Sequence, residues 1–398
     1  MLERFNFAKN HDFKGKICLM RVDFNVPLQD GVISDDTRIQ RIIPGIQRLL
    51  AQGARMVLIS HLGRPKGEVK SELTLQPIAS YLSSLLGQSV GMIDDVTSAD
   101  AVQQTSLMAD GEILLAENIR FWKGEEANDP EFAAQLAKLG DVFIADAFSA
   151  AHRAHASTAG ITAYLPSFAG DALDAELSAL QAALEAPKRP VVAVVGGAKV
   201  STKLAVLEHL IERTDALILG GGMANSFLGA QGMDMKASLS EADLFDAARQ
   251  ILKRADTVGC QLVIPVDGLA TKEFKAGADY RAIANEELEE GEMMLDVGPA
   301  SIEAALQVIK GASTILWNGP MGAFEIEPFD KATIALAQAV AERTQSGDVV
   351  SVAGGGDTVA ALNVAGVAGE FSYVSLAGGA FLEWLEGKSL PGIAALEQ

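Results

Sequence analysis

The sequence predicts an α/β protein with two doubly wound parallel sheets, each in a lobe of its own. Two observations predict this class. Short runs of β-branched and apolar residues alternate with segments of helical periodicity, which is typical of parallel βαβ units. The chain of 398 residues exceeds the roughly 250 to 300 at which a single hydrophobic core stops growing. We therefore expect two lobes of similar size, joined by a helix and a hinge.

Strands are expected at short apolar runs, because parallel strands covered on both faces lack polar alternation. Between the first two runs, apolar residues from Ile39 to Leu50 recur at helical spacing. The first lobe's expected strands are Ile17–Val22, Met56–Ser60, Ile113–Ala116 and Val142–Ala145. The second half repeats the plan, which makes both lobes Rossmann-like in outline. Its expected strands are Val191–Val195, Ala216–Leu219, Leu262–Val266, Thr314–Trp317, Val349–Ala353 and Tyr373–Leu376.

The middle of the chain is expected to form a stiff connector. Asp171–Glu185 carries leucines at helical spacing and is followed by a segment with two prolines, Ala186–Pro190. Proline ends a helix because it lacks an amide hydrogen.

Composition excludes several classes of partner. The net charge of -20 argues against nucleic acid and anionic lipid. The two cysteines, Cys18 and Cys260, lie far apart in apolar runs and are expected to be buried thiols. The sequence shows no apolar signal segment and no apolar stretch of membrane-spanning length, so the cytoplasm fits. Neither a Walker A motif nor the motifs of serine hydrolases and zinc enzymes are found.

The first glycine-rich turn follows the run Val191–Val195. Gly196 and Gly197 allow backbone amides to approach an oxyanion closely. The helical stretch Val200–Ile211 would point its positive end at that spot. Lys199 and Lys203 are four residues apart, so we expect both ammonium groups on one face, within reach of one polyphosphate. A plain strand-to-helix turn with two surface lysines is the alternative.

Two further glycine-rich turns follow expected strands. Gly220-Gly221-Gly222 would let a flat ring or a phosphate lie against backbone. A dinucleotide fingerprint is not matched there, because Asn225 stands where glycine or alanine is required. Gly354-Gly355-Gly356 precedes Asp357 and Thr358, and Asp357 would bind Mg²⁺ together with phosphate oxygens or merely cap the helix.

Arginines near element ends are expected to form a positive well for a small, multiply charged substrate, although each alone could be a solvated surface residue. They are Arg21, Arg38, Arg64, Arg120 and Arg153. The histidines His61, His152 and His155 are expected to form hydrogen bonds or contact substrate rather than transfer protons.

Taken together, these residues resemble the phosphoglycerate kinase family over essentially the whole chain. The matching motifs occur in the family's order: Arg21–Pro27, His61–Pro65, Glu117–Phe121, His152–His155, Gly196–Lys203, Gly220–Ala224, Trp317–Gly322 and Gly354–Thr358. The resemblance implies a reversible transfer between 1,3-bisphosphoglycerate with Mg-ADP and 3-phosphoglycerate with Mg-ATP. It also implies the use of Mg²⁺ with ATP or ADP. Nothing in the sequence demands a partner subunit, so a monomer is expected.

The resemblance places substrates and lobes as follows. The first lobe, residues 1–170 plus 380–398, would bind the glycerate. Residues 171–186 would form the helix that connects the lobes. The second lobe, residues 187–379, would bind the nucleotide. Glycerate residues would be Asp23, Phe24, Asn25, Arg38, His61, Leu62, Gly63, Arg64, Arg120 and Arg153. Nucleotide residues would be Lys203, Gly220, Gly221, Gly222, Glu325, Gly355, Gly356, Asp357 and Thr358, with Asp357 on the metal. Catalytic groups would be Arg38, Lys199, Lys203, Gly378 and Gly379.

Phosphoryl transfer of this kind needs no general base, because the attacking carboxylate or phosphate is already ionised near pH 7. The work is alignment and charge neutralisation by cations and amides. Substrates on two lobes must meet with water excluded, so a hinge closure is expected, involving the connector and the turns near Ser375–Gly379.

Some positions depart from the family's pattern. Ser149-Ala150 replaces Gly-Thr, Leu376 and Phe381 replace smaller residues, and Thr202 stands where many members carry Asp. Two alternatives stay open: a dehydrogenase, and a phosphate-ligand-binding protein that has lost catalysis.

Overall fold

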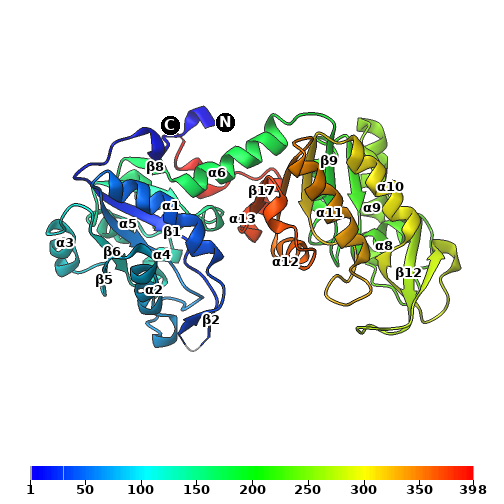
Figure 1. The fold of residues 1–398 in the computed structure, drawn as a ribbon, viewed down its shortest axis with the longest axis horizontal. Helices are drawn as coiled ribbons and strands as arrows, with labels where there is room; N and C mark the ends of the chain where they lie inside the picture. Colours follow the sequence, from blue (N-terminus) through cyan, green and yellow to red (C-terminus); the bar gives the residue numbers. More distant parts are fainter. Residues whose placement is uncertain (1, 30, 398) are drawn as a thin grey trace. The chain divides into compact units, whose positions relative to one another are not determined.

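Two six-stranded parallel sheets dominate the computed structural model, which describes residues 2–29 and 31–397 (Figure 1). The chain divides into two units, each containing one of these sheets. The first unit comprises the residues up to Ser178 and those from Ser389 onward, and the second comprises Ala179–Lys388.

The first unit's sheet has the strand order β5-β6-β4-β1-β7-β8, with all neighbours parallel. The chain leaves β1 toward one side of the sheet and returns on the other side at β7, so β1 and β7 flank the topological switch point. The strands are β1 (Ile17–Val22), β4 (Arg55–Ile59), β5 (Val90–Ile93), β6 (Ile113–Ala116), β7 (Val142–Asp146) and β8 (Ser167–Ala169). A short hairpin is formed by β2 (Leu28–Gln29) and β3 (Val32–Ile33).

The long helices α1 and α2 cover the first sheet with buried apolar residues. On α1, Ile39 and Ile46 have no exposed surface, although Pro44 lies between them. The helices of this unit are α1 (Thr37–Ala51), α2 (Gln76–Leu86), α3 (Ala99–Ser106), α4 (Lys123–Glu126), α5 (Pro130–Ala137) and α14 (Pro391–Ala394).

The second unit's sheet has the order β11-β10-β9-β15-β16-β17, also fully parallel. This is the doubly wound order with its switch point between β9 and β15, where ligands of such sheets bind beyond the strand ends. The strands are β9 (Val191–Val195), β10 (Ala216–Leu219), β11 (Gln261–Val263), β15 (Thr314–Asn318), β16 (Val350–Gly354) and β17 (Tyr373–Ser375). An antiparallel sheet adds β13 (Arg281–Ala284), β12 (Asp267–Thr271) and β14 (Met293–Val297).

Seven helices of the second unit surround these sheets among the described residues. They are α7 (Leu204–Leu210), α8 (Gly221–Ala230), α9 (Phe245–Val258), α10 (Pro299–Gly311), α11 (Lys331–Gln345), α12 (Gly356–Val364) and α13 (Gly378–Leu385). The core between sheet and helices contains Trp317, which is 1% exposed and packs edge-on against Phe371.

The expected strands are present, with shifted ends, and the two-lobed parallel architecture is confirmed. The sequence did not predict β5, β8 or the antiparallel sheet. The expected strand Leu262–Val266 is shorter and ends at Val263.

The expected connector and the expected lobe boundaries also differ from the structure. The connector is α6 (Asp171–Leu180) followed by a π-helical turn at Gln181–Glu185. Residues 380–388 belong to the second unit rather than the first, because α13 packs against α7 and Phe381 is fully buried there.

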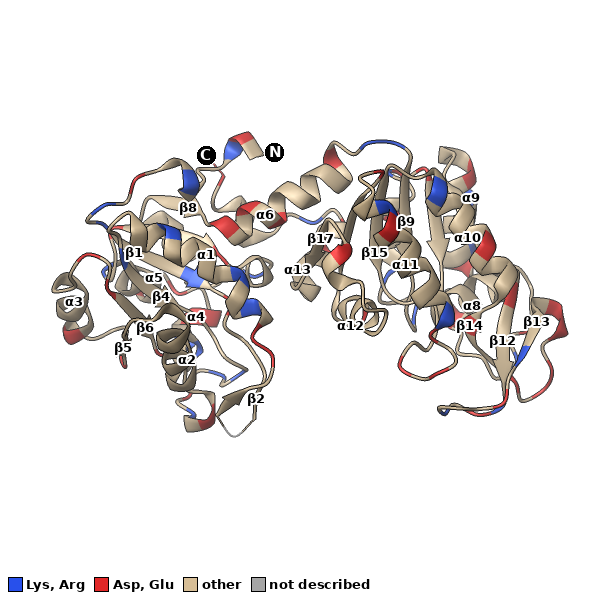
Figure 2. Cartoon of the chain, in the orientation of Figure 1, with Lys and Arg blue, Asp and Glu red and all other residues tan. Residues whose placement is uncertain are grey.

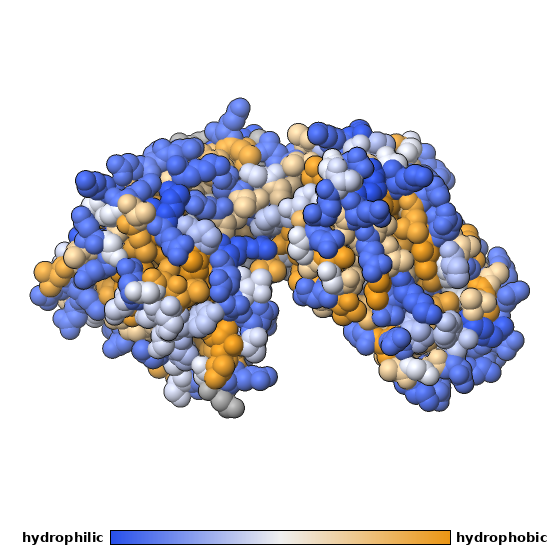
Figure 3. Space-filling model, in the orientation of Figure 1, coloured by the Kyte–Doolittle hydropathy of each residue, from blue (hydrophilic) through white to orange (hydrophobic). Residues whose placement is uncertain are grey.

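Charged and apolar surface is distributed over both units. Figure 2 shows Asp and Glu on many outer elements, including α3, α9 and β13. The face visible in Figure 3 is mostly hydrophilic, with hydrophobic side chains in patches between, as is ordinary for a folded surface. No helix of the described ranges is long and apolar enough to cross a membrane.

Candidate functional site

The first group of site residues lies beyond the carboxyl end of β1. Asp23 Oδ1 accepts a hydrogen bond from the Asn25 amide at 3.0 Å, and Oδ2 accepts from Arg38 Nη1 at 2.6 Å. Ser149 Oγ donates to the same Oδ2 oxygen. Asn25 Oδ1 accepts from the Gly63 amide at 2.9 Å, which fixes the loop after β4. The turn after β1 is thus bonded to that loop.

His61 is held as a neutral hydrogen-bond donor. Its Nδ1 lies 3.0 Å from Arg21 Nη2. An arginine can only donate, so Nδ1 accepts and the ring proton sits on Nε2. Burial, and then the neighbouring charges of Arg21, Arg120 and Arg38, place the pKa of His61 well below its usual value. The prediction that His61 forms hydrogen bonds rather than transfers protons agrees with this geometry.

Arg120 is positioned from both ends of its side chain. Its Nη1 donates to Gly63 O at 2.9 Å, and its Nε lies 3.5 Å from Glu126 Oε1 in an ion pair. Asn118 fixes the backbone on which Arg120 stands: Oδ1 accepts from the Arg120 amide at 3.2 Å, and Nδ2 donates to Leu62 O at 2.8 Å. Burial lowers the pKa of Arg120, and Arg153 and Arg64 lower it further because their charges are close.

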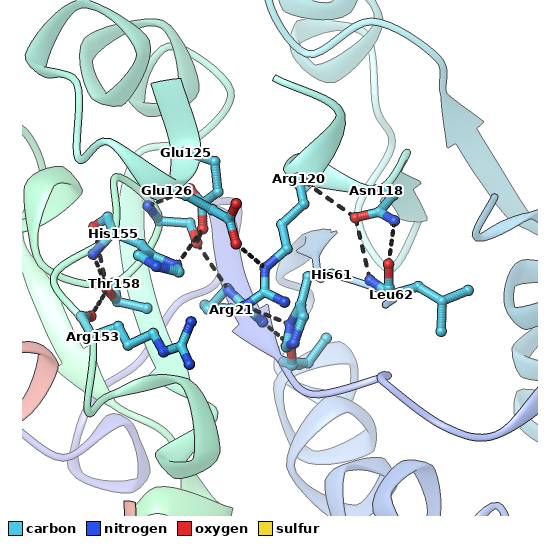
Figure 4. A network of polar contacts seen from close by, with 12 residues as sticks. Arg21, His61, Leu62, Asn118, Arg120, Glu125, Glu126, Arg153, His155 and Thr158 are labelled. Atoms are coloured by element: carbon cyan, nitrogen blue, oxygen red, sulfur yellow. Dashed lines mark hydrogen bonds and ion pairs between the residues drawn. The ribbon is translucent and has the colours of Figure 1, made fainter. Parts of the chain in front are cut away.

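Arg64 and Arg153 are exposed, and neither guanidinium has a hydrogen-bond or ion-pair partner within residues 2–29 and 31–397. The Arg153 carbonyl accepts from Thr158 Oγ1 at 2.8 Å, which anchors its backbone. Figure 4 shows the Arg120 and Arg153 side chains and the His61 ring directed toward one region. Two cations free to pair, beside a fixed neutral donor, are suited to a phosphate or carboxylate.

Arg21 has a different place from the one that the sequence suggested. It is 1% exposed and donates inward, to Ser157 Oγ at 3.0 Å, to Val22 O and to His61. It is therefore part of the support of the site rather than a free cation of the expected positive well.

In the second unit, close backbone approach explains the glycines that follow β9, β10 and β15. A Cβ on Gly196 would lie 1.9 Å from Pro320 O, so no side chain fits. Gly319 has φ +100°, and its Cβ would lie 2.2 Å from Gly196 O. Gly221 has φ +66° and its Cβ would meet Gly197 O at 2.5 Å. These turns put backbone against backbone at the switch point of the sheet.

Lys203 is a partly buried cation near the carboxyl ends of β9 and β15. Its Nζ donates to Asn318 O at 3.1 Å and also to Asn318 Oδ1. Burial lowers the pKa of Lys203 to about 8, while the charge of Asp357 opposes the shift.

The prediction of one helix with Lys199 and Lys203 on the same face is wrong, because α7 begins only at Leu204. Residues before it form a turn in which Thr202 Oγ1 donates to Lys199 O, and Glu241 accepts from the Ser201 amide at 2.9 Å. Lys199 is exposed on that turn.

The turn after β16 presents a carboxylate at a helix start. Gly355 has φ +102° and precedes α12, whose first turn contains Asp357. Asp357 does not cap the helix; it is exposed, and within the described ranges no residue bonds to its carboxylate. Thr358 is buried and accepts from the Gly319 amide through Oγ1 at 2.7 Å.

The start of α13 adjoins that of α12, since a Cβ on Gly378 would lie 3.8 Å from the Gly356 amide nitrogen. Gly379 and Glu325 are exposed. A cavity near Gly221 is lined by Leu295, Asp296 and Met321, and Gly220 and Gly222 lie at the start of α8 beside it. Burial raises the pKa of Asp296 to about 7.

No cluster of three or more His, Cys, Asp or Glu side chains arranged to hold a metal occurs in the described part of the chain. A divalent cation bound here would need phosphate oxygens to complete its ligands, as Mg²⁺ does with nucleotides. The open carboxylate of Asp357 fits that arrangement.

Comparison with known proteins decides the family. The family model "Phosphoglycerate kinase" matches residues 8–388. The chain belongs to the phosphoglycerate kinase family. It is 55% identical over 387 residues to the phosphoglycerate kinase of Sinorhizobium medicae, with 97% of each chain covered. It is 54% identical over 394 residues to that of Azorhizobium caulinodans, with 99% of each covered.

A solved phosphoglycerate kinase structure from Coxiella burnetii superimposes with a TM-score of 0.92, at 44% identity and 98% coverage of both chains. The match supports a kinase that acts in glycolysis, as the sequence predicted. The dehydrogenase alternative receives no support from these comparisons.

Sequence reasoning did not single out Asn118, Glu125, Ser157 and Asn318 as supporting residues. Each is buried and bonds to a site residue or to the element that carries one. Asn118 and Asn318 lie inside the motifs Glu117–Phe121 and Trp317–Gly322, but no role was predicted for them. The contacts of Glu125 and Ser157 join segments far apart in sequence, so no local spacing could have indicated them.

Proposed function

We propose that this chain catalyses reversible phosphoryl transfer between 1,3-bisphosphoglycerate with Mg-ADP and 3-phosphoglycerate with Mg-ATP. The observation that carries the proposal is that the charges of Arg153 and Arg64 lie close to Arg120, and that Arg120, Arg153 and His61 are directed toward one region, which would suit a small anion on the first unit. The second unit adds a glycine-lined sheet edge with Lys203 and Asp357. Family membership supports the same reaction.

For the glycerate, we propose that its phosphate binds Arg64, Arg120 and Arg153 together with the His61 Nε2 hydrogen. Asp23 and Asn25 would contact its hydroxyl and carboxylate region, with Phe24, Leu62 and Gly63 forming the backbone around them. Arg38 would reach the migrating group either by breaking its ion pair with Asp23 or while keeping it. The ion pair of Arg38 with Asp23 supports this, because it keeps the guanidinium beside the glycerate site.

For the nucleotide, we propose that Lys203 and the amides of Gly355 and Gly356 bind phosphates, while Asp357 binds the Mg²⁺ that arrives with them. Thr358, which is buried, would support the site by fixing the turn at Gly319. Gly220, Gly221 and Gly222 would lie beside the adenine, and Glu325 would contact the ribose. Lys199, Gly378 and Gly379 would neutralise the transferring group.

No proton has to be removed from the attacking oxygen, so the residues supply alignment and charge. A bound Mg²⁺ would neutralise phosphate charge. We further propose that the two units close on their substrates, since reacting atoms must come within roughly 3 to 3.5 Å. Small-angle scattering with both substrates bound should show compaction, and an unchanged radius of gyration would contradict the closure.

One experiment tests the reaction: a coupled assay that starts from 3-phosphoglycerate, ATP and Mg²⁺ and detects the acyl phosphate. Product formation is expected. Binding of both ligands without product would favour the alternative of a binding protein that has lost catalysis. We also propose that the chain acts as a monomer in the cytoplasm, which analytical ultracentrifugation and fractionation would test.

A further inference from the structure

A buried chain of hydrogen bonds leads from α4 to His61. Glu125 has no exposed surface, and its carboxylate accepts from the Ser157 amide at 2.9 Å and from Ser157 Oγ at 2.6 Å. Ser157 Oγ in turn accepts from Arg21 Nε at 3.0 Å, and Arg21 Nη2 lies 3.0 Å from His61 Nδ1. Figure 4 shows Glu125, Arg21 and His61 beside the side chains of Arg120 and Arg153.

The direction of each bond is set by chemistry. Glu125 as a carboxylate only accepts, so the Ser157 hydroxyl donates to it. That leaves the hydroxyl lone pairs facing Arg21, which only donates. Arg21 also donates to His61, because a guanidinium can only donate, and the ring proton is left on Nε2. Glu125, three hydrogen bonds away, acts by holding Ser157 and Arg21 in the positions from which this bond is made.

The hydrogen bonds from Glu125 through Ser157 and Arg21 to His61 form a relay. This relay also places a negative charge near the buried guanidinium of Arg21. Arg21 is 1% exposed, and an unpaired buried guanidinium is costly. Glu125 supplies the largest opposing charge to the burial that lowers the pKa of Arg21. The cations Arg120 and Arg38, and also His155, face His61 and disfavour a charged imidazole.

We propose that Glu125 is a positioning residue of the glycerate site, which acts through Ser157 and Arg21 to hold His61 as a fixed Nε2–H donor toward the anionic substrate. This inference rests on the proposed function for the identity of the substrate. A neutral donor in this place contributes its hydrogen bond without titrating, whereas the open guanidinium groups contribute the charge.

Glu125→Gln is the direct test. A carboxamide has one acceptor oxygen and a donor NH₂, so it cannot accept both the Ser157 amide and hydroxyl hydrogens on separate oxygens. Arg21 loses the largest of its opposing charges at the same time, while Asp23 remains. We expect KM for 3-phosphoglycerate to rise about tenfold, with kcat and KM for ATP within about twofold, because the hydrogen bond from His61 to the charged substrate is weakened. Glu131→Gln, an exposed position on α5, is the matched control and should change neither KM.

A second variant and a spectroscopic measurement keep the test decisive if Glu125→Gln unfolds. Ser157→Ala leaves the carboxylate and breaks the relay, so KM for 3-phosphoglycerate should rise several-fold while thermal unfolding shows a folded protein. In ¹⁵N-histidine NMR of the free protein, His61 should be the Nε2–H tautomer and should lose that fixed state in either folded variant. An Nδ1–H His61 in the unmodified protein, or folded variants with unchanged KM and unchanged tautomer, would overturn the proposal.

The NMR measurement requires no substrate. Failure of the kinase reaction itself would appear as absent product in the unmodified protein, while the tautomer would still decide the relay.

Discussion

Lys203 gives the sharpest prediction about nucleotide binding. Burial lowers its pKa to about 8 in the free protein. Nucleotide phosphates would raise that pKa on binding, because a nearby anion favours the charged form. Below pH 8 the ammonium is already protonated, whereas above pH 8 binding must take up a proton. At pH 9, about 0.9 of a proton per bound Mg-ADP is expected from a pKa of about 8.

Isothermal titration calorimetry at pH 9, in two buffers with different protonation enthalpies, measures this uptake. The Kd for Mg-ADP should also be about tenfold weaker at pH 9 than at pH 7, since only about a tenth of the lysine is charged there. In Lys203→Arg the cation stays protonated, so the uptake should vanish. Uptake below about 0.3 at pH 9, or uptake that persists in Lys203→Arg, would refute the assignment of this lysine to the phosphates.

Three further perturbations follow from the structure. Arg153→Ala should raise KM for 3-phosphoglycerate by about tenfold and leave KM for ATP unchanged in steady-state kinetics, because its guanidinium is open to an anion; equal changes in both would count against it. Gly196→Ala should destabilise by roughly 3 kcal/mol or more in urea unfolding, since its Cβ would lie 1.9 Å from Pro320 O; wild-type stability would contradict this. Burial raises the pKa of Asp146 to about 7, so this group's contribution to stability is full below about pH 4 and is lost as pH rises toward 7. Asp146→Asn should therefore be more stable than the unmodified protein at pH 8 but not at pH 4, by urea unfolding; an equal difference at both values would exclude titration as the cause.

The sequence predicted the sheets where local pattern and burial agree. Val191–Val195 is a fully buried strand, as its β-branched run indicated. By contrast, β5 contains Gly91, and the expected strand Leu262–Val266 ends at Val263, while Val266 is 60% exposed. Strands at sheet edges receive part of their stability from partners, so their own sequence indicates them weakly.

The sequence indicated the glycine-rich turns best where glycine has no substitute. The turns at Gly196, Gly221, Gly319 and Gly355 need close backbone approach or positive φ, and the glycine pattern carries that information. The placement of Lys199 and Lys203 could not be predicted from the sequence in the same way. Ser201 and Thr202 bond to neighbouring groups and delay the helix start, a competition that helical spacing does not show.

Local sequence patterns could not predict the supporting roles of Glu125 and Ser157. Glu125 and Ser157 are remote from Arg21 in sequence, and only the folded chain shows which groups each of them bonds. A buried Glu on a four-residue helix has no sequence signature of its own.

The same buried cations imply that each unit is less stable without its ligand. Lys203 loses hydration in the second unit, and Arg120 keeps a buried Nε with no hydrogen-bond partner in the first. Leaving such groups partly unsatisfied costs free energy, which an anion would recover on binding. A ligand at 100 times its Kd stabilises the folded state by about 2.7 kcal/mol. If the proposed sites are right, 3-phosphoglycerate should slow hydrogen exchange around β1 and α4, and Mg-ADP around β9 and α12. Protection of the same amides by both ligands singly would contradict the division of substrates between the units.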